Sequence, residues 1–405
     1  MNTPFFTGSL PLAGVRVLDL SRVLAGPMCA MALGDLGAEV IKVEHPARGD
    51  DTRDWGKRVG THNTAYFNSF NRNKEGVGID LQKSEGLRLV RELARKSDVL
   101  VQNFKFGGME KLGLGYDALR AENPGLIYCS ISGYGRDSSE AERPGYDLVI
   151  QGEAGLMALN GEADQGPLKF GVAVVDLFTG MYSAQAILAA LFDRQRTGQG
   201  RHIQMALYDC GLMVTAYYGM EALALGAEPP KYGNDHPTIV PYGVFDAADG
   251  PLVITVGNNA QYQRFCNEAI GRPDLAVDPR YATNISRSAH REALMPELRK
   301  ELRARPRKQL LERLTAAGIP CGEVLDLLQA LQSPRARQAN LITRQPLPGG
   351  GGDMPVPAPP YRFDGERLPV RHPPPALGQN TEQVLGSLLD LTPEQITALR
   401  AGGVV

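Results

Sequence analysis

Apolar runs and one helical stretch alternate in a regular order along the first part of the chain. Residues 15–20 (VRVLDL) form an apolar run typical of a buried strand, and residues 39–43 form a second one. Between them, residues 28–36 favour a helix that Gly37 ends. A strand, a helix and a strand in this succession predict a βαβ unit, with both strands in a parallel sheet covered by helices.

The alternation continues and predicts an α/β fold for the first half of the chain. Short apolar runs indicate strands, and longer stretches with apolar residues three and four apart indicate helices. The elements expected are a helix at 87–94, strands at 99–101 and 126–131, a short strand at 172–175, a long apolar helix up to residue 192, and a strand at 200–207.

The composition changes at about residue 225, which indicates a second, smaller domain. Residues 226–241 are rich in Pro, Gly and Asn, a hairpin is predicted at 243–257, and residues 290–317 favour surface helices. We therefore divide the chain into a large α/β domain (1–224), a small middle domain (225–330) and a return segment (331–405).

Residues 346–375 of the return segment hold ten of the 29 prolines and four successive glycines. Proline excludes a helix or a central strand, so we expect an extended crossing over the surface; a disordered linker is the alternative. Thr392-Pro393-Glu394-Gln395 is a capping box that predicts a C-terminal helix completing the large domain.

Charge and composition narrow the class of protein. The 405 residues carry 43 Lys and Arg against 45 Asp and Glu, and this near-neutral balance gives no support for nucleic-acid or membrane-surface binding. No uninterrupted apolar stretch is long enough for a membrane span, and the N-terminus has no signal-peptide pattern. Five dispersed cysteines indicate reduced thiols, so we expect a soluble cytoplasmic enzyme.

Familiar cofactor motifs are missing. A dinucleotide fingerprint needs G-x-G-x-x-G after the first strand, but the turn at 23–27 has one glycine. The P-loop, G-x-S-x-G and H-E-x-x-H patterns are absent too, and the six histidines show no metal-ligand spacing. We expect no metal and no tightly bound cofactor.

Asp176 is a candidate functional carboxylate because it lies between an expected strand and the start of a helix. In α/β sheets this junction is where ligands bind, and the helix dipole should keep the carboxylate ionised. The alternative is a plain helix N-cap.

Basic residues near expected strand ends are candidates for holding phosphate groups. Scattered surface charge is the alternative for each of them. They are Lys42, Arg53, Arg72, Lys74, Lys105 and Lys111.

Several long segments resemble the class III coenzyme A transferases, the group of formyl-CoA and carnitine CoA transferases. The resemblance covers essentially the whole chain. Its segments are VRVLDLSRVLAGPMCAMALGDLGAEVIKVEHPARGDDTR, FNRNKEGVGIDL, VQNFKFGGMEKLGL, ISGYG, RPGYDLVIQGEAGLM, VVDLFTGMYSAQAILAALFDRQRTGQG and AGIPCGEVLDL.

The resemblance implies a nucleophile, a CoA site and an assembly. It makes Asp176 the nucleophile, with acyl-CoA and a free acid as the substrates. It implies a Rossmann-like large domain built from both chain ends, a small middle domain and an interlocked homodimer. The positions it assigns to CoA are Val23, Leu24, Ala25, Ile79, Asn103, Phe104 and Lys111, beside the basic residues Lys42, Arg72, Lys74 and Lys105.

The same superfamily contains α-methylacyl-CoA racemases, which pair the aspartate with a histidine. At the matching position this chain has Tyr146, and tyrosine is a poor two-way proton shuttle near neutral pH. A transferase is therefore favoured over a racemase, and Tyr146 is expected in the substrate pocket or as a plain core aromatic. A catalytically inactive CoA-binding protein is a further alternative.

Two departures from the family pattern concern the site. A glycine run that covers the active site in some transferases is reduced here to Gly257-Asn258-Asn259. Gln82 falls near a family lysine that binds CoA, with Lys83 beside it.

The stretch from Tyr232 to Asn259 is similar to relatives that use succinyl-CoA with C4–C6 dicarboxylic acids. Such acids need a cation for the second carboxylate, and Arg53, Arg72 or His236 could provide it. Leu24 completes the expected substrate pocket.

Overall fold

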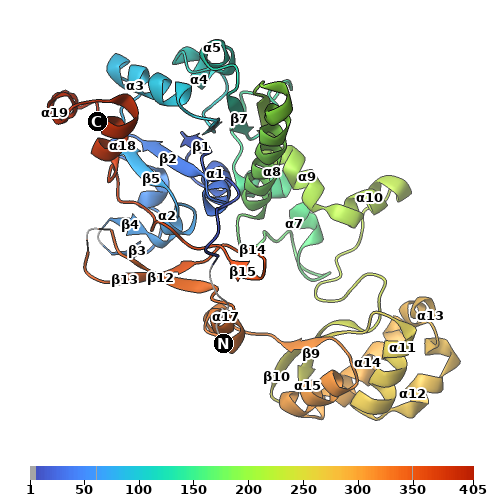
Figure 1. Cartoon of the computed structure of the whole chain (residues 1–405). Coiled ribbons are helices and arrows are strands. Elements are labelled where there is room, and N and C mark those ends of the chain that lie inside the picture. The colour runs from blue at the N-terminus through green and yellow to red at the C-terminus, as the bar shows by residue number, and fades with distance from the viewer. Residues whose placement is uncertain (1–5, 61, 349) are drawn as a thin grey trace. The chain divides into compact units, whose positions relative to one another are not determined.

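A parallel sheet of six strands forms the centre of the chain in the computed structural model, which describes residues 6–60, 62–348 and 350–405. The spatial order is β5-β2-β1-β6-β7-β8, and every pair is parallel. Numbered along the sheet-forming strands, this is the doubly wound order 3-2-1-4-5-6, which reverses between β1 and β6. Figure 1 labels β5, β2, β1 and β7 of this sheet. The strands are β1 (Arg16–Asp19), β2 (Glu39–Glu44), β5 (Glu75–Gly78), β6 (Val99–Gln102), β7 (Ile127–Ser132) and β8 (His202–Ala206).

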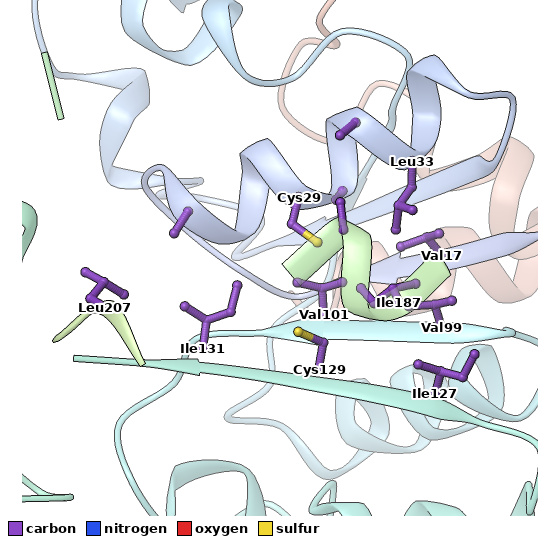
Figure 2. Packing of buried hydrophobic residues seen from close by; sticks show 14 of the residues in the cluster. Val17, Cys29, Leu33, Val99, Val101, Ile127, Cys129, Ile131, Ile187 and Leu207 are labelled. Atoms are coloured by element: carbon purple, nitrogen blue, oxygen red, sulfur yellow. The ribbon is translucent and has the colours of Figure 1, made fainter. Parts of the chain in front are cut away.

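The two faces of this sheet bury alternate residues of each strand. Val17 and Leu18 are neighbours on β1, yet they belong to different cores because strand side chains alternate in direction. One face packs against α1 (Ala25–Asp35) and α8 (Val174–Thr197), as Figure 2 shows for Cys29 and Ile187. The opposite core includes residues of α3 (Ser84–Arg95), α5 (Tyr116–Glu122), α18 (Thr381–Leu389) and α19 (Pro393–Ala401).

Most of the expected elements are confirmed, including the parallel sheet and the capping box at Thr392. The expected strand at 172–175 is wrong, because α8 already begins at Val174. The apolar run there fills the first turn of a buried helix, while β7 pairs directly with β8. By length and composition α8 could cross a membrane, but its Ile187 and Val175 are fully buried in the sheet core.

The described chain forms two compact units. The larger comprises Met1–Leu156, Lys169–Ala227 and Gln332–Val405, and the smaller comprises Met157–Leu168 and Glu228–Leu331. The sequence analysis assigned residues 157–168 to the large domain, whereas in the structure they cluster with the smaller unit.

The smaller unit has an antiparallel sheet of three strands and its own hydrophobic core. The expected hairpin is β9 (Tyr242–Ala247) with β10 (Gly250–Thr255), and β11 (Cys321–Glu323) pairs with β10. The helices are α11 (Asn259–Arg264), continued by a π-helical segment (Phe265–Ile270), α12 (Pro273–Val277), α13 (Asn284–Ala289), α14 (Arg291–Arg303), α15 (Arg307–Ala316) and α16 (Leu327–Leu331). The helices expected at 290–317 are α14 and α15, and each buries leucines in this core, among them Leu298 and Leu310.

The proline-rich return segment is extended, as expected, and it also contains a hairpin that the sequence did not predict. In this hairpin β12 (Ile342–Pro346) pairs antiparallel with β13 (Asp353–Pro357). Further along, the carbonyl of His372 accepts a hydrogen bond from the backbone N–H of Asn73 at 2.9 Å. Such bonds to the N-terminal part of the larger unit exclude the disordered-linker alternative.

Gly180 allows α1 and α8 to cross closely. A Cβ at this position would lie 2.7 Å from the carbonyl oxygen of Ala25 and 2.8 Å from Cβ of Met28. Replacing Gly180 by Ala should therefore cost about 1–3 kcal/mol of stability through overpacking, despite the better helix propensity of alanine. Thermal unfolding of the purified variant measures this.

Gly386 in α18 is the matched control, since a Cβ there would find no atom nearer than 3.7 Å. Gly386→Ala should leave the melting temperature unchanged or raise it. If Gly180→Ala melts like Gly386→Ala, the close crossing of α1 and α8 is not a constraint on stability.

Candidate active site

A cavity of ≈ 200 Å³ lies at the carboxyl ends of the sheet strands, where the strand order reverses between β1 and β6. Asp176 lies in its wall, together with the loops that follow β1, β6 and β7. The residues that line it are Arg22, Val23, Leu24, Ala25, Asp51, Asn103, Phe104, Lys105, Phe106, Ile131, Ser132, Gly133, Ala141, Glu142, Arg143, Pro144, Gly145, Tyr146, Asp176 and Leu207. The structure thus brings together Asp176, the turn 23–25, Asn103, Phe104, Lys105 and Tyr146, as the sequence analysis expected.

Asp176 is the third residue of α8 and its side chain is almost wholly buried. Burial, and then the charge of Asp147, raise the pKa of Asp176 to about 7 from its ordinary value of 3.8. The expectation that the helix dipole keeps this carboxylate fully ionised is therefore wrong, because desolvation and a like charge outweigh the dipole.

Asp147, the first residue of α6 (Asp147–Glu153), caps α8 from outside. Its Oδ1 accepts hydrogen bonds from the backbone N–H groups of Val175 at 2.8 Å and Asp176 at 3.2 Å. Its Oδ2 accepts a bond from Nε2 of Gln151 at 2.6 Å. Asp176 is therefore not the N-cap, and its carboxylate is left for other work. The role of Asp147 was not predicted from the sequence, although the residue lies in the segment RPGYDL that carries the family resemblance.

Two glycines bring this capping segment onto the sheet. A Cβ on Gly133, after β7, would lie 2.7 Å from Cα of Gly145, and a Cβ on Gly145 would lie 2.8 Å from Cα of Gly133. Any side chain at either position would push the two backbones apart. The approach places Tyr146 at the cavity, where 62% of its surface is exposed, so it is not a core aromatic.

The turn after β1 is held from the loop that follows β6. Oδ1 of Asn103 accepts the backbone N–H of Arg22 at 2.9 Å, and Nδ2 of Asn103 donates to the carbonyl of Arg22 at 2.8 Å. The backbone N–H of Phe104 is bonded to Oε1 of Gln102 at 2.8 Å. Asn103 and Phe104 therefore shape the cavity wall through the backbone as well as their side chains.

The four basic residues nearest the sheet do not face the cavity, which corrects their assignment to CoA or to a carboxylate. Lys42 and Lys74 are fully buried, the first paired with Asp50 at 3.0 Å and the second with Asp19 at 2.9 Å. Burial lowers the pKa of Lys74 to about 8, despite the neighbouring Asp19.

Arg53 and Arg72 are buried in two-pronged pairs with carboxylates. Nε and Nη2 of Arg53 reach Glu44 at 2.8 and 2.6 Å, and those of Arg72 reach Asp35 at 3.0 and 2.5 Å. These guanidinium groups bind protein carboxylates inside the sheet domain, so neither is available to a ligand.

A second cavity, of ≈ 370 Å³, shares Arg22, Asp51 and Phe104 with the first. Ile79 and Gln82 line it, which fits the position that the resemblance gives to Ile79. Lys111, at the end of α4 (Gly108–Lys111), is exposed and lines neither of these two cavities. Arg22 lines both, and the sequence analysis did not single it out.

The remaining candidates lie in the smaller unit, where they have local partners. Oδ1 of Asn258 accepts the backbone N–H of Gln261, and Oδ1 of Asn259 accepts Nη2 of Arg287 at 3.1 Å. The backbone N–H of Gly257 donates to Oε1 of Gln261 at 2.7 Å. Burial and Arg291 lower the pKa of His236, so it is a poor cation for a substrate carboxylate at neutral pH.

The strand order and the cavity with its buried aspartate agree with a comparison against known families. Residues 12–381 match the family described as CoA-transferase family III, and the chain belongs to this family. It is a class III CoA transferase, as the resemblance implied.

Individual relatives are similar over nearly their whole length. A succinate–glutarate CoA-transferase of Agrobacterium fabrum is 42% identical over 386 residues, which are 93% of this chain and 96% of the relative. The human succinyl-CoA:glutarate CoA-transferase is 37% identical over 98% of this chain and 90% of its own. Among solved structures, a CAIB/BAIF family protein from Brucella suis has a TM-score of 0.83 and 41% identity, covering 94% of this chain and all of that one.

The Asp147 charge should set the pH range in which Asp176 is ionised. Asp147→Asn removes the like charge but keeps an acceptor for the α8 backbone, so the pKa of Asp176 should fall. The acidic limb of the profile of kcat/KM against pH should then move to lower pH. Glu142→Gln, a change at another carboxylate of the cavity wall, should leave the limb in place. An unmoved limb in Asp147→Asn would show that burial alone raises this pKa.

The raised pKa also predicts how Asp176 affects stability. Between pH 3.8 and about 7 the folded protein holds a proton on Asp176 that the unfolded chain has released. Stability therefore falls as the pH rises through this window, and above it Asp176 destabilises the fold. Asp176→Asn should raise the melting temperature at pH 8 and leave it nearly unchanged at pH 4. The exposed Asp209→Asn should show no such pH dependence.

Proposed function

We propose that this enzyme moves CoA from succinyl-CoA to a free dicarboxylic acid, with Asp176 as the covalent carrier. The observation that carries the proposal is the buried Asp176 carboxylate in the wall of the cavity at the sheet switch point. The relatives named for succinyl-CoA, succinate and glutarate support the choice of acids.

The transfer proceeds by exchange between carboxylates and one thiolate. The Asp176 carboxylate attacks the thioester carbonyl of succinyl-CoA; the C–S bond breaks, leaving a mixed anhydride and CoA thiolate. The thiolate attacks Cγ of Asp176, which releases succinate and forms an aspartyl-CoA thioester. The acceptor carboxylate attacks this thioester, and the returning thiolate attacks the acceptor's acyl carbon, which yields the new acyl-CoA and frees Asp176. No proton is gained or lost in the cycle.

The environment of Asp176 suits a nucleophile. No described side chain or backbone N–H donates a hydrogen bond to its carboxylate, and a carboxylate with few such bonds and little water has a reactive lone pair. With a pKa of about 7, roughly half of the molecules carry the ionised form at neutral pH. Backbone N–H groups near Gly26 are candidates to stabilise the oxyanions that form at each step.

The anionic ends of the substrates need cations from the cavity wall. Arg143 already pairs with Glu140 and Glu153, whereas the exposed guanidinium of Arg22 pairs, among the described residues, with Asp51 alone, at 3.3 Å. Lys105 is exposed at the same cavity. We assign the CoA phosphates and the second carboxylate of the acid to Arg22 and Lys105, in place of Arg53, Arg72 and His236.

The racemase alternative lacks its second proton carrier. Tyr146 occupies the position of the racemase histidine, and Asp147 beside it is bonded to the backbone of α8. A measurement of turnover distinguishes the transferase from an inactive CoA-binding protein.

Self-association as a homodimer, interlocked as the family resemblance implies, is part of the proposal. Helices α9 (Leu207–Val214) and α10 (Ala216–Leu225) expose large apolar side chains, among them Met213 (64%), Met220 (69%) and Leu223 (84%). Exposed apolar side chains gathered on two successive helices support an interaction site there. We also place the enzyme in the cytoplasm, in keeping with five cysteines that are all free.

One experiment separates the three functions. The protein is mixed in deuterated water with succinyl-CoA, a pool of dicarboxylic acids and a 2-methylacyl-CoA, and mass spectrometry follows every CoA ester. New CoA esters without α-deuterium are expected, and they identify the acceptor. Deuterium at the α-carbon of the 2-methylacyl-CoA without acid exchange would establish the racemase, and no change in any ester would favour a binding protein.

Asp176→Ala should abolish transfer, by at least a thousandfold, while the protein stays folded and binds CoA. Asp353→Ala, a change at an exposed carboxylate of β13 that lines neither cavity, should transfer at the wild-type rate. Wild-type protein quenched during turnover should carry CoA on the peptide that contains Asp176. Wild-type-like turnover in a folded Asp176→Ala protein would refute the nucleophile.

A further inference from the structure

The turn after β1 contains a residue in a conformation that its side chain disfavours. Val23 has φ +71°, in the left-handed region. A β-branched residue rarely occurs there, because its Cβ substituents crowd the backbone. Such a conformation persists only where the surrounding structure holds it.

The carboxylate of Asp50 accepts hydrogen bonds from the backbone of this turn. Its two carboxylate oxygens both lie 3.2 Å from the backbone nitrogen of Val23, which donates to them. Oδ1 also accepts bonds from the backbone N–H and the hydroxyl of Thr52, at 3.0 and 2.8 Å. The Asp50 side chain is fully buried, and five donor contacts in all fix its orientation.

Lys42 bonds both Asp50 and the turn, and we call Asp50 and Lys42 together the clamp. Its Nζ donates to Oδ2 of Asp50 at 3.0 Å and to the carbonyl of Ser21 at 2.9 Å. The acid therefore holds the N–H of Val23, and the base holds the carbonyl two residues earlier. Burial would raise the pKa of Asp50, but Lys42 and Thr52 outweigh it and lower this pKa. The carboxylate is therefore ionised throughout the working range of pH.

The clamp acts on the wall of the active-site cavity. Val23, Leu24 and Ala25 line this cavity, while the Lys42 side chain has no exposed surface. If Val23 relaxed to a negative φ, the peptide planes on both sides of it would rotate and the wall would change shape.

We propose that Asp50, supported by Lys42, is a positioning residue that keeps Val23 left-handed and so shapes the turn for the CoA thioester. The proposal rests on the proposed function in one respect, that this turn binds CoA. It gives the buried Lys42–Asp50 pair a task that an ion pair of merely structural importance would not have.

The test is a rescue by glycine, which adopts φ near +70° without strain. Asp50→Asn keeps the size of the side chain but weakens the clamp, and it should raise the KM for succinyl-CoA about tenfold while kcat changes less than threefold. That rise equals about 1.4 kcal/mol of binding free energy. Adding Val23→Gly to Asp50→Asn should restore most of the KM, whereas adding Val23→Ala should not, because alanine keeps a Cβ.

Asp390→Gly is the matched control for the relief of strain. Asp390 is left-handed too, with φ +57°, but it ends α18 and lines neither cavity. Combined with Asp50→Asn, it should leave the raised KM as it is. If Val23→Gly fails to restore the KM, or if kcat falls while the KM stays constant, the clamp is refuted.

Binding of free CoA tests the turn independently of catalysis. The Kd of free CoA measures how well the turn binds CoA and requires no transfer. A wild-type protein that binds CoA but transfers nothing would therefore refute the proposed function and leave the clamp standing. A Kd unchanged by Asp50→Asn would refute the clamp. If Asp50→Asn does not fold, Thr52→Val removes the hydroxyl bond to Oδ1 of Asp50 at a buried residue that lines neither cavity. Its loss of CoA binding should likewise be restored by Val23→Gly, and a loss that glycine does not restore would count against the clamp.

Discussion

The larger unit depends on buried charges that neutralise one another beside the first strands of the sheet. The pairs Lys42–Asp50, Arg53–Glu44, Arg72–Asp35 and Lys74–Asp19 are all buried. Such pairs add little net stability, but breaking one leaves a buried charge without a partner, so they specify geometry strongly. Nζ of Lys74 also bonds the carbonyl of Pro27 in α1 at 2.9 Å, and Nη1 of Arg53 bonds that of Pro375 at 3.3 Å. The same charges therefore fix both the start of α1 and the returning end of the chain.

Asp176 is the exception to this neutralisation, and the contrast explains its chemistry. Asp50 receives five donor contacts, while the Asp176 carboxylate receives none from the described residues and has Asp147 nearby. Two buried carboxylates of one domain thus have pKa values shifted in opposite directions. Burying Asp176 without a partner lowers stability. The ion pairs and the close helix crossing of the surrounding fold offset this and hold the site in shape.

The sequence predicted the sheet better than the orientation of side chains. Continuous apolar runs identify buried strands such as β1 and β7, and the resemblance identified Asp176, because both signals are local in the chain. Strand β5 (EGVG) was missed, since two of its four residues are glycine and it has no apolar run. Lys42 and Arg72 were placed correctly near strand ends but assigned to a ligand, because spacing cannot tell whether a side chain points into the domain or out of it. Asp147 was missed as a cap because its partners lie 28 and 29 residues away along the chain.

Cations that could bind a CoA ester lie apart from the carboxylate that attacks it. A nucleophilic carboxylate loses reactivity when a cation neutralises it, yet the substrate brings phosphates and a second carboxylate that require cations. The larger unit has two groups of cations, one paired internally and one at the cavity. Those beneath the site are committed to internal carboxylates, whereas Arg22 and Lys105 lie on loops at the cavity wall. Because Asp176 has no cation among its electrostatic partners, the anionic ends of a substrate can be held at the wall without lowering the pKa of the attacking group through a direct pair. The fold therefore permits tight binding of a polyanion and a reactive carboxylate in the same cavity.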